Sequence, residues 1–166
     1  MTATIYLKAG KERSLLRRHP WIYATGIGRT EGRLAVGATV IVRSADGKFL
    51  AKAAWSPASQ IRARVWTFNE AEPVDHAFFK RRIAQALAFR RDWVADTDAT
   101  RLIFGEADGL PGLIVDRYRD QLVCQFTAAG VEHWKDAIVA ALIKETGCAN
   151  VYERSDASVR AREGLE

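Results

Sequence analysis

The strongest constraint on the fold is a β-hairpin signal in the first half of the chain. Residues 38–43 are rich in β-branched side chains, Asp46-Gly47 follows, and residues 49–55 complete a second strand. An Asp-Gly pair favours a tight hairpin turn, because that turn needs positive φ angles. Residues 61–68 alternate with period two, which predicts a third strand. We therefore expect a small, mostly antiparallel β-barrel with one short helix up to about residue 70.

Positive charge is concentrated in the same half of the chain. The 166 residues carry a net charge of +5, but residues 1–66 contain twelve Lys and Arg against three acids, which gives +9. Residues 67–166 contain 13 Lys and Arg against 17 acids, which gives −4. This division indicates two units, of which the first has a polyanionic partner.

The composition, 48% hydrophobic and 27% charged, excludes disordered and collagen-like classes. No apolar run approaches the roughly 20 residues of a membrane span, and the first residues lack the pattern of a signal peptide. A cytoplasmic protein without a membrane partner is expected. Two distant cysteines and three scattered histidines predict neither a disulfide framework nor a metal site.

Residues 11–23 combine cations with aromatic side chains. Four cations lie within eight residues, Pro20 stops any helix, and Trp21 and Tyr23 follow; the cations are Lys11, Arg13, Arg17 and Arg18. Dispersed cations suit a phosphate backbone, and a flat ring suits an unstacked base. A short amphipathic helix with Leu15 and Leu16 facing a core and solvated arginines explains the same residues. Both interpretations stay open at this point.

The strand at residues 61–68 raises the same question. Its alternation places Ile61, Ala63 and Val65 on one face and Arg62, Arg64 and Trp66 on the other. An outward row of two arginines and a tryptophan is unusual for a solvated face. In so small a barrel some aromatic side chains must fill the core, so Trp66 either stacks on a base or packs inside.

The second half predicts a long helix followed by a small α/β unit. The helix is expected at residues 75–95, with Asp75 as its N-cap. Strands are expected at residues 102–104, 113–116, 122–126 and 150–153, and a helix at 131–146, ended by Gly147. The expected domains are an RNA-binding unit at residues 1–70, a linking helix at 71–98 and a middle domain at 99–166.

Two enzymatic signals can be explained by turns. Gly26, Gly28 and Gly32 resemble a dinucleotide fingerprint, but the next residues lead into a strand instead of a helix. Glu106, Asp108 and Asp116 are candidates for paired carboxylate catalysis or a hard metal ion. The first two acids lie in a Gly-Glu-x-Asp-Gly-x-Pro-Gly run that also suits a tight turn. An independent enzyme built on these acids is the least favoured class.

Four motifs in order resemble the RlmI family of 23S ribosomal RNA cytosine-C5 methyltransferases, which depend on S-adenosylmethionine. The matching segments are residues 14–21, 56–68, 105–112, and 152–156 through 162–164. The resemblance implies a PUA domain followed by a linking helix and a small β-β-α-β-β type domain. The expected fold class is α+β, with the family's Rossmann-like methyltransferase domain absent from a truncated chain that ends inside a hairpin.

The resemblance also implies function. This chain would be the RNA-binding and substrate-positioning portion of a 23S ribosomal RNA methyltransferase, inactive alone, with S-adenosylmethionine bound by the intact protein only. The family suggests a homodimer of the intact protein. No catalytic, cofactor-binding or metal-binding residue is assigned; the expected RNA-binding residues are Arg17, Arg18, Trp21, Lys52, Arg62, Arg64 and Trp66. The alternative is a free-standing PUA-type RNA-binding or assembly module without catalytic activity.

Overall fold

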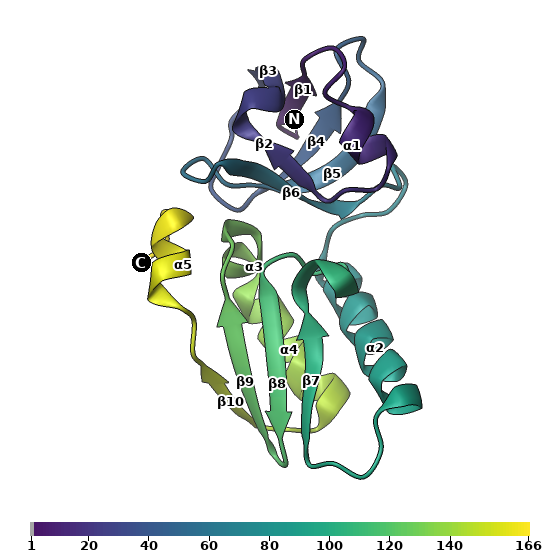
Figure 1. The fold of residues 1–166 in the computed structure, drawn as a ribbon, viewed down its shortest axis with the longest axis vertical. Coiled ribbons are helices and arrows are strands. Elements are labelled where there is room, and N and C mark those ends of the chain that lie inside the picture. Colours follow the sequence, from purple (N-terminus) through teal and green to yellow (C-terminus); the bar gives the residue numbers. More distant parts are fainter. Residues whose placement is uncertain (1) are drawn as a thin grey trace.

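The computed structural model describes residues 2–166, and it contains two sheets joined by a long helix (Figure 1). The first sheet has six strands in the order β2-β6-β5-β4-β1-β3 and curls on itself. All its pairs are antiparallel except β1 with β4. Its strands are β1 (Thr4–Leu7), β2 (Trp21–Tyr23), β3 (Ile27–Glu31), β4 (Thr39–Arg43), β5 (Phe49–Trp55) and β6 (Ile61–Thr67).

The expected hairpin is present as β4 and β5. Val40 pairs with Ala53 and Val42 with Ala51 in antiparallel register, and all four side chains are fully buried in the core of the first sheet. Gly47 has a φ of +87°, the left-handed conformation that the turn requires. The stretch before β2 forms only one helical turn, α1 (Arg13–Leu16), whose Leu15 is buried in the same core.

Helix α2 (His76–Trp93) connects the two sheets. Asp75 caps it as expected, because its carboxylate accepts a hydrogen bond of 2.8 Å from the backbone N–H of Phe78. Phe78, Phe79 and Ile83 on one stripe are completely buried. In the described part of the chain no helix is long and apolar enough to cross a membrane.

The second sheet has four strands in the order β10-β9-β8-β7, and helices cover one of its faces (Figure 1). Trp134 separates the two helices that follow β9, and the longer one ends at Gly147 with a φ of +71°. The elements are β7 (Ala99–Phe104), a 3-10 turn (Gly105–Asp108), β8 (Leu113–Tyr118), β9 (Gln121–Phe126), α3 (Ala129–His133), α4 (Lys135–Thr146), β10 (Asn150–Glu153) and α5 (Ala157–Arg162).

This order corrects the expected β-β-α-β-β type. Three antiparallel strands precede the helices, and β10 then pairs with β9 in parallel, so that β9, α3, α4 and β10 form a β-α-β crossover. The residues expected to continue a hairpin form helix α5 instead. The Asp156 carboxylate accepts hydrogen bonds from the backbone N–H groups of Ser158 and Val159, which satisfies the first turn of a helix.

Helix α5 returns toward the first sheet, beside β6 in Figure 1. It is held at its base by Arg160, which donates to the carbonyl of Phe126 at 2.9 Å and to the Glu132 carboxylate at 2.8 Å. The chain thus ends against the unit with which it began. The contacts between the two units define the clefts in which the candidate site lies.

Candidate nucleic-acid interface

The segment around α1 carries unpaired positive charge. We call residues 11–18 the α1 segment. Its four cations have exposed side chains, and within residues 2–166 none of them forms an ion pair with an acid; the cations are Lys11, Arg13, Arg17 and Arg18. Some other cations of the first unit are paired, namely Arg29 with Glu31 and Lys48 with Asp46 at 3.1 Å. Charge that is not locally neutralised remains available to an external anion.

Arg18 has an unusual backbone for its residue type. Its φ is +65°, a left-handed conformation that costs a non-glycine residue about 1–2 kcal/mol. The turn places the guanidinium 4.8 Å from the centroid of the Phe68 ring, a cation–π distance. The guanidinium therefore stands over an aromatic ring at the end of β6, which is an arrangement that suits a phosphate and a base together.

Trp21 lies at the boundary between the two units. Its indole Nε1–H donates a hydrogen bond of 2.8 Å to Oε1 of Glu106, which belongs to the 3-10 turn after β7. The edges of His19 and Tyr23 approach it, with centroid distances of 5.7 and 6.4 Å. The ring is half-buried, so it keeps some surface for a ligand while it fixes the turn.

Trp66 is buried, and only 3% of its surface is exposed. Its ring meets Phe78 and Phe79 edge to face, at centroid distances of 6.2 and 5.2 Å. Gly130 of α3 packs against the same ring, so closely that a Cβ there would lie 2.7 Å from Trp66 Cζ2. Of the two roles that the sequence left open for Trp66, the structure places it in the core between the units.

Arg64 makes a buried ion pair with Glu163, the residue that follows α5. Two guanidinium nitrogens donate to the two carboxylate oxygens at 2.7 Å each, and the Ser59 hydroxyl donates to Oε1 at 2.6 Å. The side chains of Arg64 and Glu163 are 11% and 5% exposed. We call this group, Arg64 with Ser59 and Glu163, the clasp. No local sequence pattern signals a contact between residues so far apart.

The remaining two expected cations lie on the first sheet. Lys52 Nζ donates to the backbone carbonyl of Glu72 at 2.6 Å, and Arg62 donates to the carbonyl of Pro57. The Arg62 guanidinium lies 6.0 Å from the centroid of the Trp55 ring. Neither residue has an acidic partner within the described chain, so no neighbouring acid neutralises its charge.

Two clefts between the units share Glu106 as a lining residue. The first, which we call the cation-lined cleft, has a volume of about 640 Å³ and includes Arg18, Phe68, Asn69 and Arg82. The second, which we call the apolar pocket, has a volume of about 380 Å³ and includes Trp21 and Phe104. Both volumes are in the range of small-molecule and nucleobase sites.

Acidic and basic groups compensate one another at the floor of the cation-lined cleft. Burial raises the pKa of Glu72, but hydrogen bonds from Thr67 and Arg81 and the positive charges of Arg82 and Arg81 outweigh it, so the pKa lies below its ordinary value. The Glu72 carboxylate therefore stays charged and holds Arg81 and Arg82, each at 3.3 Å. Considering the described residues only, the cation left without an acid at this cleft is Arg18.

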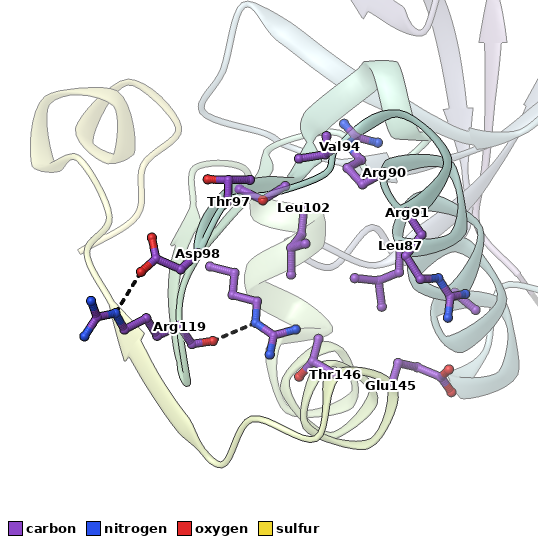
Figure 2. Close-up of a pocket in the computed structure, with 13 residues that line it drawn as sticks. Leu87, Arg90, Arg91, Val94, Thr97, Asp98, Leu102, Arg119, Glu145 and Thr146 are labelled. Atoms are coloured by element: carbon purple, nitrogen blue, oxygen red, sulfur yellow. Dashed lines mark hydrogen bonds and ion pairs between the residues drawn. The ribbon is translucent and has the colours of Figure 1, made fainter.

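A third cavity, of about 610 Å³, lies between α2, α4 and the start of β7, as Figure 2 shows. Arg119 pairs with Asp98 at 2.8 Å on its rim, and its carbonyl accepts a hydrogen bond from Arg117. Arg90 pairs with Asp108 through contacts of 2.5 and 2.8 Å. Two of the arginines that line this cavity, Arg90 and Arg119, are thus paired with acids, which distinguishes the cavity from the α1 segment.

The three acids considered for catalysis are separated by their partners. Glu106 accepts from Trp21, Asp108 is paired with Arg90, and Asp116 is paired with Arg101 at 2.8 Å. Asp108 also accepts from the backbone N–H of Phe104 at 2.7 Å, which ties it to the turn that its sequence predicted. No cluster of potential metal ligands occurs within residues 2–166.

Comparison with known families now identifies the first unit. Residues 5–68 match the PUA-like domain family, which covers the curled first sheet and α1.

The whole chain also matches curated ribosomal RNA large subunit methyltransferase I proteins. It is 54% identical over 168 residues to the protein from Vibrio vulnificus strain YJ016 and 50% identical over 169 residues to that from Aliivibrio fischeri strain MJ11. The Citrobacter koseri protein is 47% identical over 169 residues. In each case the match covers 100% of this chain and 42% of the relative.

Solved structures with the same fold are described as methyltransferases. One, complexed with SAH, superposes with a TM-score of 0.80 at 18% identity, over 96% of this chain and 41% of its own. Another, a SAM-dependent methyltransferase from Streptococcus mutans, has a TM-score of 0.79 at 18% identity, over 93% of this chain and 41% of its own. At this identity the likeness shows the fold alone.

These structures correct the fold class expected from the sequence. The expectation was an α+β chain from which the Rossmann-like methyltransferase domain is absent, whereas the two solved structures described above carry the name of methyltransferases. The parallel pairing of β9 with β10 across the α3–α4 crossover, which forms a β-α-β unit, was not expected from the sequence.

The family resemblance is confirmed, since close to half or more of all aligned residues are identical along the entire chain. Over its whole length the chain is similar to ribosomal RNA large subunit methyltransferase I proteins, and it spans 42% of their length.

Proposed function

We propose that this chain is the RNA-recognising and substrate-positioning portion of a 23S ribosomal RNA cytosine-C5 methyltransferase that uses S-adenosylmethionine and acts in the cytoplasm. One observation carries the proposal: the α1 segment presents four exposed cations, without acidic partners among residues 2–166, beside the cation-lined cleft. The PUA-like match and the names of the relatives support an RNA partner.

The seven expected RNA-binding residues take different parts in this proposal. Arg17 and Arg18 contact phosphates directly, and Lys52 and Arg62 add charge on the same unit. Trp21 offers a half-buried ring at the boundary of the units. Arg64 and Trp66 serve recognition indirectly, because the clasp and the packing of Trp66 on Phe79 hold the clefts in shape.

The proposed division of the chain follows from these roles. Residues 1–70 bind RNA, residues 71–98 link the units, and residues 99–166 position the substrate. In a longer protein that forms a homodimer, each protomer presents its own α1 segment and cation-lined cleft. Affinity for a long RNA then comes from several such contacts acting together.

The test is a titration of the chain with a labelled 23S ribosomal RNA fragment at two salt concentrations, about 50 and 200 mM. Affinity should fall with salt, because phosphate contacts release condensed counterions. The double variant Arg17→Ala with Arg18→Ala should reduce the slope of log affinity against log salt by about 2, since each of the two arginines neutralises one phosphate.

The matched control is Arg29→Ala with Lys48→Ala, which removes the same charge from cations that are already paired with Glu31 and Asp46. This control should leave the slope close to that of the unaltered chain. Salt-independent affinity, or equal slopes for the two double variants, would overturn the proposal.

A further inference from the structure

We propose that the apolar pocket is a binding site for one unstacked RNA base that carries an exocyclic amino group. The inference rests on the proposed function, which supplies RNA as the partner. The pocket lies between the units, with Trp21 and Ile61 on the side of the first sheet and Phe104, Ile114 and Val159 on the other side. Its volume of about 380 Å³ is sufficient for a nucleobase.

The walls of the pocket are apolar and aromatic. Phe104 is 53% exposed although it is a large apolar side chain, and it pairs in register with Ile114 on the face of the second sheet that the helices leave uncovered. The Arg101 guanidinium lies 5.3 Å from the centroid of the Phe104 ring. An exposed ring beside a guanidinium provides a stacking surface for a base.

One carboxylate gives the pocket its polarity. Glu106 uses Oε1 to accept from the Trp21 indole, and within residues 2–166 its Oε2 accepts no hydrogen bond. Arg64, the cation that also lines the pocket, is neutralised by Glu163. A half-buried carboxylate oxygen without a protein partner repels a phosphate and can accept a hydrogen bond from an N–H donor of a ligand.

The ligand that meets these requirements is flat, uncharged and equipped with an N–H donor at its edge. Cytosine, adenine and guanine each present an exocyclic amino group, which a glutamate can accept, whereas the corresponding group of uracil is a carbonyl. The phosphates of the same strand would remain outside the pocket, where the cations of the first unit are available. This arrangement makes the pocket a site of base preference and leaves affinity to the α1 segment.

The first experiment compares oligocytidine with oligouridine of equal length, so that phosphate contacts cancel in the ratio of affinities. The unaltered chain should favour oligocytidine by about tenfold, in the range expected for one amino group recognised by a carboxylate. Glu106→Gln keeps an oxygen for the Trp21 N–H but presents an NH2 group in place of Oε2, so the preference should disappear or reverse.

Glu145→Gln is the matched control, because it removes the same charge from the third cavity. It should leave the preference unchanged. A second variant, Phe104→Ala, removes an exposed stacking ring. It should lower the affinity for both oligonucleotides by about tenfold or more without changing the ratio of the two affinities. The urea midpoints of all variants are measured in parallel, and they should agree with that of the unaltered chain.

Two outcomes separate this inference from the proposed function. If affinity depends on salt but neither Glu106→Gln nor Phe104→Ala changes base preference or affinity, the pocket assignment is wrong and the proposed function stands. If affinity shows no salt dependence, the proposed function fails. A third arm of the experiment uses S-adenosylmethionine and adenosine monophosphate as probes. The inference is overturned if either probe binds saturably, if Phe104→Ala abolishes that binding, and if the chain shows no preference between the two oligonucleotides. The pocket would then be assigned to a free nucleotide.

Discussion

Breaking the clasp should separate the structural role of Arg64 from a role in RNA binding. Glu163→Ala leaves the Arg64 guanidinium, whose side chain is only 11% exposed, without its carboxylate. It also removes both Arg64 hydrogen bonds and the one from Ser59. Removing one partner of a buried ion pair costs about 3–5 kcal/mol, because the other charge remains desolvated.

The loss of stability has an upper limit that the structure sets. Helix α5 lies near the end of the described chain, and Arg160 attaches its base to Phe126 and Glu132. If α5 detaches from β6, water solvates Arg64, so the cost cannot exceed the free energy with which α5 docks. We therefore expect a decrease of about 3 kcal/mol in the free energy of unfolding, together with faster hydrogen exchange in α5.

The assay is urea unfolding of Glu163→Ala, Arg64→Ala and the double variant, with RNA affinity measured at the same salt concentrations as above. The double variant should recover part of the stability, since no buried charge is then left unpaired. Arg64→Met with Glu163→Leu is the matched apolar replacement and should be close to neutral. The reasoning would be refuted if Glu163→Ala lowered the free energy of unfolding by less than about 0.5 kcal/mol and left hydrogen exchange in α5 unchanged. A change of that size is usual for surface substitutions.

Three further predictions concern the core and its titration. Gly130→Ala should lower the free energy of unfolding by about 1–3 kcal/mol in urea, because the new Cβ would lie 2.7 Å from Trp66 Cζ2. Burial raises the pKa of Glu132, but hydrogen bonds and charges from Arg160 and Lys135 outweigh it and hold the pKa below 4.5. Glu132 therefore stabilises the fold above pH 4.5, and a urea series should show this stability decreasing as the pH falls through the lowered pKa. Burial raises the pKa of Cys124 to about 12, so a thiol reagent at a pH of about 8 should react with it only after unfolding.

The elements of the first unit were predictable because their signals are local. The hairpin follows from β-branched alternation around Asp46-Gly47, and Gly47 has the positive φ that this turn demands. The cap of α2 likewise follows from Asp75 alone. Each of these features is decided by residues fewer than about ten positions apart, where periodicity and turn chemistry are informative.

The second sheet was only partly predictable, because its strand order depends on pairing between distant segments. The strands β7, β8, β9 and β10 lie close to the expected positions, yet their alternation does not say that β10 joins β9 in parallel. The final helix was missed for a different reason. Only Asp156 signals its start, and α5 has six residues, too few to show a helical period.

The alternation on β6 shows why the site was predicted only in part. The face with Arg64 and Trp66 was correctly distinguished from the face with Ala63 and Val65, and it was expected to face the partner RNA. In the structure this face meets the second unit, so both faces of β6 are buried there. Sequence periodicity shows that a strand has two different faces. It does not show whether a ligand or another part of the same chain packs on a given face.

The same contacts explain how recognition can be divided between affinity and selectivity. The cations of the α1 segment are exposed and have no acidic partner within the described residues, and Arg18 among them lines the cation-lined cleft, so they can attract any polyanion. Trp21, Glu106 and the clasp lie within that interface, and their hydrogen bonds of 2.6–2.8 Å fix the walls of the apolar pocket. A base that enters the pocket must fit walls that both units supply. Base preference should therefore disappear when the units separate, whereas salt-dependent affinity should remain with the first unit.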